Sequence, residues 1–460
     1  MNREELLARA RTEGIRLVRF LYCDNANIVR GKAAHARALA DFLDCGVGLT
    51  VAMQGFCITE HLAQGSALGP VGEVRLVPDP DTFALLPYAP GEARLLCDMH
   101  TLEGTPWENC PRSFLKRIAT QAAGEGLTVQ AGFEYEFYLA RQFPAPLGDD
   151  PGAEQLTVRY VPADDSLCFS SDGMDHAGPV IGEILDALDR QGLEPRQYYP
   201  ELGPGQQELT ILHAALPAAA DRQIAVRETV RGVSLQHGLV ASFAPKPFPN
   251  QAGSGCHVHL SLWRDGRNVL YDPQDSLGLS ALGRSFIAGL LEHLPALLAI
   301  TCPSVNSYRR LAPNMWSSAY TCWGPDNREA AVRLASPFKG RVEATTNLEV
   351  KAIDGSANPY LALGALVAAG LDGIRRSLDP GQPLTVNPHD LDEQERRRRR
   401  IRRYPITLAE AIAELERDQV LLDALGTSLA REFLAVRRAE LADLGSASVE
   451  QEVATYFRRY

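Results

Sequence analysis

The sequence has neither a long apolar run nor a paired cysteine motif. Its longest stretch without a charged side chain, residues 355–371, is shorter than the ~20 apolar residues that span a membrane. The stretch also contains Asn358-Pro359, so we expect a buried helix there. Residues 1–20 are charged and amphipathic, unlike a secretory signal. The nine cysteines include no CxxC pair, which is typical of reduced thiols. We therefore expect a cytoplasmic protein without a membrane partner.

Basic residues are too few for a nucleic-acid-binding surface. The 460 residues include 46 lysines and arginines against 57 aspartates and glutamates, which gives a net charge of −11. This balance argues against nucleic acid as a partner and favours small-molecule substrates. With 45% hydrophobic residues, the chain can bury a large core, and its length suggests more than one domain.

Signatures of several common chemistries are also missing. The sequence has no P-loop pattern GxxxxGKS/T, no GxSxG elbow and no evident Cys–His nucleophile arrangement. The glycine turns at 203–206 and 253–255 are weak signals by themselves. Seven histidines show no metal-like spacing, and we interpret them as structural or surface residues: His35, His61, His100, His213, His237, His293 and His389.

The most informative stretch is residues 127–139, LTVQAGFEYEFYL, where apolar and other residues alternate strictly. Such alternation predicts a half-buried strand. One face enters a core, and the other presents Glu134 and Glu136 about 7 Å apart. Neighbouring carboxylates repel each other unless a cation lies between them. A solvated strand face is the simple alternative for this stretch taken alone.

Three later stretches repeat the pattern of one apolar and one reactive face. The strand predicted at 206–212 follows a turn and carries an acid, the one at 255–263 carries histidines, and the one at 347–353 carries an acid and a lysine. The residues on these reactive faces and in that turn are Glu201, Glu208, His257, His259, Ser261, Asn347, Glu349 and Lys351. The recurrence favours a shared site over a solvated face.

Acid-rich oxygen sites suit hard divalent ions such as Mg²⁺ or Mn²⁺, and imidazole tolerates Mn²⁺. Six candidate ligands suffice for two ions: Glu134, Glu136, Glu201, Glu208, His257 and Glu349. Four cations on nearby motifs suit phosphate or carboxylate: Arg310, Arg328, Arg333 and Lys351. Metals with phosphate-binding arginines indicate phosphoryl transfer. The alternative is that individual arginines form surface ion pairs.

We expect two domains in an α+β fold. Residues 1–103 have the pattern of a small unit with a hairpin at 17–33 and further strands near 73–100. Residues 104–460 alternate predicted helices with the carboxylate-bearing strands and end in a helical tail at 407–442. The arginine-rich run at 396–403 is interpreted as a solvated charged segment, with an interface or phosphate contact as the alternative.

Six motifs in order resemble the glutamine synthetase superfamily: GFEYEFYL, PELGPGQQE, GSGCHVHLSL, NSYRRLAP, WGPDNREAAVR and EVKAIDGSANPYLALGALVAAGLDGI. The resemblance implies an amino-terminal β-grasp-like domain and a catalytic domain of antiparallel strands flanked by helices. It also implies a ring-type homo-oligomer whose sites lie between adjacent subunits. In the family, ATP phosphorylates the γ-carboxylate of glutamate, and an amine then attacks the acyl phosphate.

The resemblance assigns a role to each matching residue. One ion would be held by Glu136, Glu201 and Glu208, and the ion that orients ATP by Glu134, His257 and Glu349. His259, Ser261 and Arg333 match nucleotide contacts. Gly253 and Arg310 match residues that hold glutamate, and Arg328 matches the arginine at the transferred phosphoryl group. Mg²⁺ or Mn²⁺, two per subunit, and ATP as co-substrate follow from this resemblance.

The chain departs from the ammonia-using family members. The stretch before Gly55-Phe56 contains no acid, and Trp316 replaces the flap glutamate six residues after Arg310. Lys351 and Asn347 stand where the family has arginines. The divergent, nodulin-type relatives are more similar. We therefore predict an ATP-dependent ligase that joins glutamate, or a similar acid, to an organic amine. We expect the acid to contact Lys351 and the amine to contact Trp316. The alternatives are a non-catalytic assembly or regulatory protein, ordinary glutamine synthesis from ammonia, and a metal-dependent hydrolase.

Overall fold

The computed structural model describes residues 1–144 and 158–460. The amino-terminal unit contains a six-stranded sheet in the order β2-β1-β6-β4-β3, with β5 beside β6. Its elements are α1 (Arg3–Thr12), β1 (Leu17–Cys23), β2 (Val29–His35), η1 (Ala36–Ala38), α2 (Leu39–Cys45), β3 (Val47–Thr50), η2 (Val51–Gln54), β4 (Glu73–Pro78), η3 (Pro80–Thr82), β5 (Ala84–Leu85) and β6 (Glu92–His100). The predicted hairpin is confirmed, since β1 and β2 pair antiparallel.

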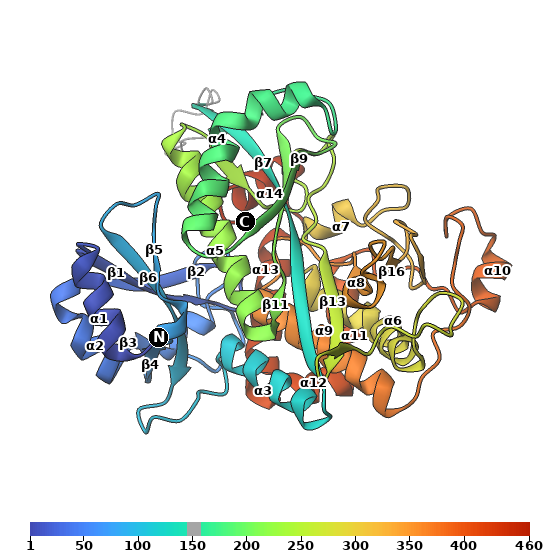
Figure 1. The fold of residues 1–460 in the computed structure, drawn as a ribbon, viewed down its shortest axis with the longest axis horizontal. Helices are drawn as coiled ribbons and strands as arrows, with labels where there is room; N and C mark the ends of the chain where they lie inside the picture. Colours follow the sequence, from blue (N-terminus) through green and yellow to red (C-terminus); the bar gives the residue numbers. More distant parts are fainter. Residues whose placement is uncertain (145–157) are drawn as a thin grey trace.

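The second sheet has eleven strands in the order β15-β16-β17-β13-β7-β10-β9, with β8, β11, β12 and β14 attached beside this path. Apart from the parallel pair β15–β16, its strands pair antiparallel. They are β7 (Thr128–Pro144), β8 (Val158–Pro162), β9 (Pro195–Pro200), β10 (Gln206–Ile211), β11 (Ala214–Ala215), β12 (Val240–Ser242), β13 (Val258–Arg264), β14 (Arg267–Asn268), β15 (Trp323–Pro325), β16 (Val332–Ala335) and β17 (Asn347–Val350). The long strand β7 runs through the middle of the molecule, with the amino-terminal unit to one side (Figure 1).

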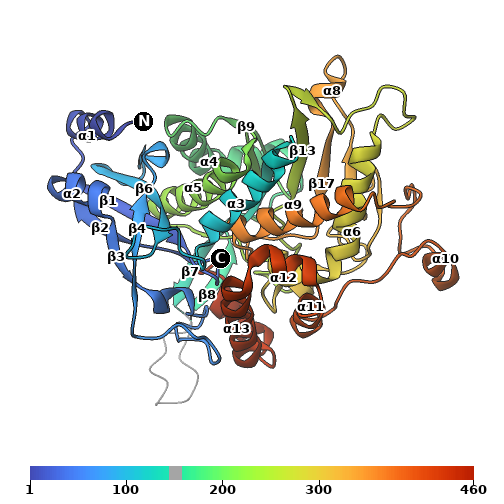
Figure 2. The same cartoon turned by 90° about the horizontal axis from the view of Figure 1, so that it is seen from below.

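Helices pack against this sheet; α3 and α9 cross the centre of Figure 2, with α11, α12 and α13 beside them in its lower half. They are α3 (Pro111–Gly124), α4 (Ser171–Arg190), α5 (Leu216–Gln236), α6 (Ala281–Thr301), α7 (Ser307–Arg310), α8 (Val342–Thr345), α9 (Pro359–Arg375), α10 (Glu393–Arg398), α11 (Leu408–Leu415), α12 (Gln419–Leu425), α13 (Thr427–Leu444) and α14 (Val449–Tyr456). The fold is therefore the predicted mixture of helices and largely antiparallel sheet.

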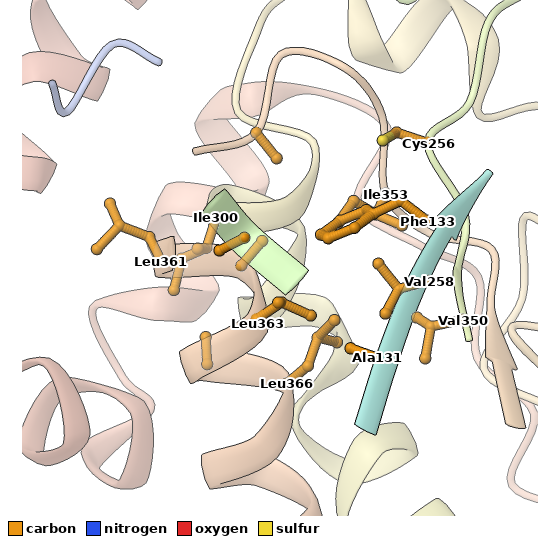
Figure 3. Packing of buried hydrophobic residues seen from close by; sticks show 14 of the residues in the cluster. Ala131, Phe133, Cys256, Val258, Ile300, Val350, Ile353, Leu361, Leu363 and Leu366 are labelled. Carbon is orange, nitrogen blue, oxygen red and sulfur yellow. The ribbon is translucent and has the colours of Figure 1, made fainter. Parts of the chain in front are cut away.

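The core lies between the apolar face of the sheet and helix α9. Phe133, Val258 and Val350 come from neighbouring strands and point toward Leu363 and Leu366 of α9 (Figure 3). The helix begins at Pro359, because the Asn358 side chain accepts from Tyr360 N–H and Leu361 N–H and a proline suits the first turn. The uncharged stretch is thus a buried helix.

Two long helices cross closely beneath the sheet. A Cβ at Gly289 of α6 would lie 2.1 Å from the carbonyl oxygen of Ala369, and a Cβ at Gly373 would lie 2.1 Å from that of Ser285. Glycine therefore permits this backbone approach. Within the described residues, α6 is also the one helix long and apolar enough to cross a membrane, but 78% of its apolar window is buried in the structure, as in a core helix.

The sequence predictions differ from the structure mainly at short elements. Strand β3 was missed because its four residues include a glycine, and the strand predicted at 83–89 shrinks to β5, since Pro87 and Pro90 interrupt it. The helical tail is divided into α11, α12 and α13. The arginine run lies partly in α10, where arginines pair with Glu393 and Glu395 at exposed positions. The boundary predicted at 103/104 falls in the loop between β6 and α3 and stays a prediction.

Candidate active site

The four predicted strands lie side by side in the order β17-β13-β7-β10. Their register places His259 opposite Glu349 on one neighbour and opposite Gly132 on the other. Glu208 pairs with Glu136 across β10 and β7. Because side chains alternate between faces in a strand, the polar residues predicted from four separate stretches share one face of this sheet.

Glu134 is at the centre of the tightest group. One of its carboxylate oxygens lies 2.9 Å from His257 Nδ1 and the other 2.9 Å from His259 Nε2. His257 Nδ1 is also 3.3 Å from Glu349 Oε1. One ligand atom each of Glu134, His257 and Glu349 lies within 4.8 Å of the others. Two carboxylates and an imidazole fit a divalent ion that accepts oxygen and nitrogen ligands.

The second predicted group is more open. Glu136 accepts from the backbone N–H of Gly255 at 2.9 Å and from Gln206 Nε2 at 3.3 Å. Glu208 accepts from the hydroxyl of Tyr199. Glu201 accepts the N–H of Leu202 at 2.8 Å. These three glutamates surround one region, but in the described part of the chain their oxygens do not converge as closely as the first group.

The two groups differ in electrostatics. Burial acts to raise the pKa of Glu134, but the charge of His259 and hydrogen bonds from both histidines outweigh it and hold this pKa well below the usual range. Burial, followed by the charges of Glu134 and Glu136, raises the pKa of Glu208 well above its usual value. Burial and Glu136 raise the pKa of Glu201 to about 7. The second group thus lacks a cation that would stabilise its charge.

The pKa of His259 shifts in the opposite direction. Burial alone would lower the pKa of His259, but the charge and hydrogen bond of Glu134 raise it to about 9. The other ring nitrogen of His259 lies 2.7 Å from Asn347 Oδ1. Asn347, a departure from the family pattern, therefore orients this histidine. Such orientation by a partner on the second nitrogen is common at metal and phosphate sites.

Cations line the same region, though not all in the expected positions. Lys351 Nζ donates to Glu349 Oε1 at 3.2 Å, and Arg333 Nε lies 3.0 Å from Glu349 Oε2. Buried Arg310 donates to His257 Nε2 at 2.9 Å, so its guanidinium contacts the metal-compatible group. Arg328 is exposed. Its role at the transferred phosphoryl group stays a prediction.

The backbone at Gly255 is packed so closely that only a glycine fits there. A Cβ at Gly255 would lie 2.6 Å from both Arg310 Nη2 and His257 Nε2. Gly253 is similar, since its Cβ would lie 2.8 Å from Arg310 Cγ, and its carbonyl accepts from Gln206 Nε2 at 3.0 Å. This segment therefore lies against the arginine, and the role of Gly253 in holding glutamate stays a prediction.

Other predicted contacts lie at the edges of the site. The Ser261 hydroxyl accepts from Trp263 Nε1 at 2.9 Å. Trp316 has a positive φ of 59° and is 61% exposed, and its backbone N–H donates to Glu329 Oε1 at 2.7 Å. The indole is thus free to meet a ligand, while a carboxylate fixes its backbone.

Sequence reasoning missed two supporting residues. Tyr199 holds Glu208, and Gln206 joins Glu136 to the Gly253 carbonyl. Gln206 lies in the PELGPGQQE motif, two residues before Glu208, so the sequence could have pointed to it. Tyr199 gave no signal, since it meets Glu208 only through the pairing of β9 with β10.

A cavity of about 170 Å³ lies near β15, β16 and α8, and no predicted site residue is among the residues that line it. It is lined by residues including Tyr271, Pro325, Leu334, Val342 and Thr346. Leu334 directly follows Arg333, and Thr346 directly precedes Asn347.

Models of two protein families match this chain. The glutamine synthetase N-terminal domain matches residues 1–107, and the glutamine synthetase catalytic domain matches residues 108–456. The chain therefore belongs to the glutamine synthetase family.

Its relatives include two kinds of enzyme by name. A gamma-glutamylpolyamine synthetase, GlnA3 of Streptomyces coelicolor, is 37% identical over 97% of this chain and 94% of its own length. The glutamine synthetase of Methanocaldococcus jannaschii is 33% identical over 99% and 98%. A solved structure described as a novel glutamine synthase homologue is 36% identical, covers 97% of this chain and 99% of its own, and has a TM-score of 0.84. GmaS in complex with ADP is 33% identical over 97% and 98%, with a TM-score of 0.81.

Family membership establishes the reaction class. The chain is an ATP-dependent ligase that forms C–N bonds, and its family uses divalent metals. The non-catalytic and hydrolase interpretations of the sequence are therefore set aside.

Proposed function

We propose that this enzyme joins the γ-carboxylate of glutamate to an organic amine. The terminal phosphoryl group of ATP moves to a carboxylate oxygen, with cleavage of its bond to ADP. The amine nitrogen then attacks the carbonyl carbon, phosphate leaves, and the nitrogen loses a proton. Two divalent ions, Mg²⁺ or Mn²⁺, would bind ATP and substrate oxygens and offset their charge. The donor set fits such ions because four carboxylates lie on one sheet face and a fifth, that of Glu201, lies in the turn after β9.

The chain's own groups support this sequence of steps. Arg310 and the Gly253 segment lie together where an acid substrate would be held, and we propose that Lys351 assists there. Arg333 and His259 contact the first metal-compatible group, and Ser261 follows His259 on the same face of β13, where ATP phosphates would lie. We propose that exposed Arg328 offsets the charge that develops on the transferred phosphoryl group.

The observation that carries the choice of amine is Trp316. Ammonium must be attracted and deprotonated, and both tasks need carboxylates. Trp316 replaces one of the acids expected for that purpose, and its indole is 61% exposed. Indole packs against apolar groups and holds cations over its face. Each buried CH₂ of an amine adds about 0.8 kcal/mol, a gain that ammonia cannot obtain.

An amine panel tests this proposal. With ATP, glutamate and Mg²⁺, phosphate release is measured for ammonia, alkylamines, aromatic amines and polyamines. We expect a hydrophobic or aromatic amine to exceed ammonia by at least about tenfold in kcat/KM, or ~1.4 kcal/mol. Trp316→Glu should shift the preference back toward ammonia, and Leu235→Glu, which places the same charge at an exposed apolar residue of α5, should not. Equal efficiency with ammonia in the wild type would refute the proposal.

A polyamine is the second candidate substrate. The relative from Streptomyces coelicolor is named as a gamma-glutamylpolyamine synthetase and aligns over almost the whole chain. Trp316 could hold a cationic amine through its face, and Glu329 lies beside its backbone. Polyamine preference would appear in the same panel, and Glu329→Gln should then reduce it while leaving an uncharged aromatic amine unaffected.

We further propose a ring-type homo-oligomer in the cytoplasm, with sites completed between subunits, as the family resemblance implies. The support is that Gly55 and Phe56 themselves present no ionisable or metal-binding side chain. Sedimentation velocity of the active enzyme tests this, and a fully active monomer would contradict it.

A further inference from the structure

A second group of metal-binding side chains lies outside the active site. Cys57 and His61, four residues apart, belong to the segment after η2, and Asp443 is near the end of α13. One ligand atom of each lies within 4.8 Å of the others. The sequence had suggested no metal role for His61. The spacing alone could not reveal the site, because the third residue is 382 positions away from His61 and arrives only through folding.

The three ligand atoms are close enough to share one ion. His61 Nε2 is 2.7 Å from Asp443 Oδ2, and Cys57 Sγ is 4.0 Å from the same oxygen. Bond lengths of about 2.0–2.3 Å around zinc place neighbouring ligand atoms roughly 3.3–3.8 Å apart. The sulfur is therefore near its required distance, and the nitrogen and oxygen must separate by less than ~1 Å. The His61 and Asp443 side chains are 50% and 30% exposed, so they have room to do so.

We propose that Cys57, His61 and Asp443 bind a zinc ion or a similar borderline-soft divalent cation. A thiolate and an imidazole favour zinc, whereas the magnesium or manganese of the active site prefers oxygen. Three protein ligands leave a fourth position for water. The Thr59 hydroxyl donates to Asp443 and orients its carboxylate. The ion would join the amino-terminal segment to α13.

Two other interpretations predict different contacts. A simple His61–Asp443 ion pair needs no sulfur, yet buried Cys57 directs Sγ toward the His61 carbonyl, at 3.2 Å, and the Thr59 hydroxyl, at 3.0 Å. A thiol nucleophile needs a ring nitrogen on its sulfur. In the described structure, Sγ has no hydrogen bond to an imidazole nitrogen, and Cys57 is fully buried. Metal binding is the role that uses all three side chains.

Cobalt provides a direct test, because thiolate coordination to Co²⁺ gives a charge-transfer absorption that oxygen and nitrogen ligands do not. The full-length protein, saturated with Mg²⁺, is titrated with Co²⁺ in a reducing, chelator-free buffer. We expect a band that saturates at about one equivalent per chain, disappears in Cys57→Ser and persists in Cys45→Ser, a change at an exposed cysteine. A wild-type protein without the band, or a folded Cys57→Ser with it, would overturn the proposal. The readout needs no substrate, so it is independent of the proposed ligase activity.

The exposed histidine offers a second route that does not depend on the folding of the Cys57 variant. Zinc affinity is measured by competition with a chromogenic chelator. We expect His61→Ala to weaken the tightest zinc site by at least about tenfold. His176→Ala removes an exposed histidine that also faces a carboxylate, Asp172 at 3.5 Å, and should leave the affinity unchanged. Equal zinc affinity in His61→Ala and the wild type would also overturn the proposal.

Discussion

Two histidine–carboxylate clusters in this protein differ in net charge. In the active site, five glutamates face three permanent cations, Arg310, Arg333 and Lys351. In the second cluster, His293 of α6 lies between Asp418, at 2.6 Å, and Asp372, at 3.0 Å, and Arg376 pairs with Asp372 at 2.7 Å. The second cluster is neutral when His293 is charged, whereas the first keeps excess negative charge.

This difference in net charge distinguishes a histidine cluster that the protein's own residues neutralise from one that needs a bound cation. Buried charges persist when they are paired, and the His293 cluster achieves this with its own residues. The active-site glutamates cannot, so the pKa of Glu208 stays high until a cation arrives. A balanced cluster indicates a structural role, and an unbalanced one that opens to solvent indicates a binding site.

Of the tests that distinguish the two clusters, metal removal should have the largest effect. Chelation followed by gel filtration should lower ligase activity by about 10³-fold or more, since the ions supply several kcal/mol of charge stabilisation. Adding Mg²⁺ or Mn²⁺ should restore it, and calorimetry should give about two ions per chain in the presence of ATP. Active protein with less than one bound ion per chain would contradict the two-metal site.

Single-ligand variants should separate the two glutamate groups. Glu136→Ala or Glu208→Ala should abolish turnover without unfolding the protein. Glu134→Ala or His257→Ala should mainly weaken ATP binding, by roughly tenfold or more. Steady-state kinetics with circular dichroism measures both effects, and Glu393→Ala on exposed α10 serves as the control. The same kinetic defect in all four variants would show that the groups act as one.

The balanced cluster should respond in stability instead of activity. His293→Gln removes one of the two donors and leaves a buried carboxylate unpaired, so we expect a loss of about 2 kcal/mol in the free energy of unfolding. The kcat/KM of the folded enzyme should stay unchanged. Urea unfolding and kinetics at low temperature measure the two quantities, and a kinetic defect without destabilisation would assign this cluster a functional role.

The smallest expected effect is a pH dependence of stability. Burial alone would lower the pKa of His293, but hydrogen bonds to Asp418 and Asp372 raise it above 6.5. The folded state therefore binds the proton more tightly than the unfolded chain. The resulting stabilisation is fully present below pH 6.5 and is lost as pH rises through the folded-state pKa. Comparing Tm against pH for the wild type and His293→Gln should show a steeper alkaline decline in the wild type.

The site could be predicted well where strand alternation and motif order carried the information. Glu134, Glu136, Glu208 and His259 were each assigned to the correct face of a strand from the period of two. Short elements such as β3 were missed, since four residues give too little periodicity. Partners that meet across separate segments, such as Tyr199 on Glu208, had no local signal.

The sequence by itself determined the reactive strands and the buried helix within residues 355–371, and it predicted a divalent-metal site, because each depends on local spacing and residue type. The tertiary structure alone decided which charges become paired. It placed Arg310 on His257 and Asn347 on His259, and it brought Asp443 to Cys57 and His61. The physical reason is that electrostatic partners are set by distance and burial in space, and residues hundreds of positions apart gain that proximity only when the chain folds.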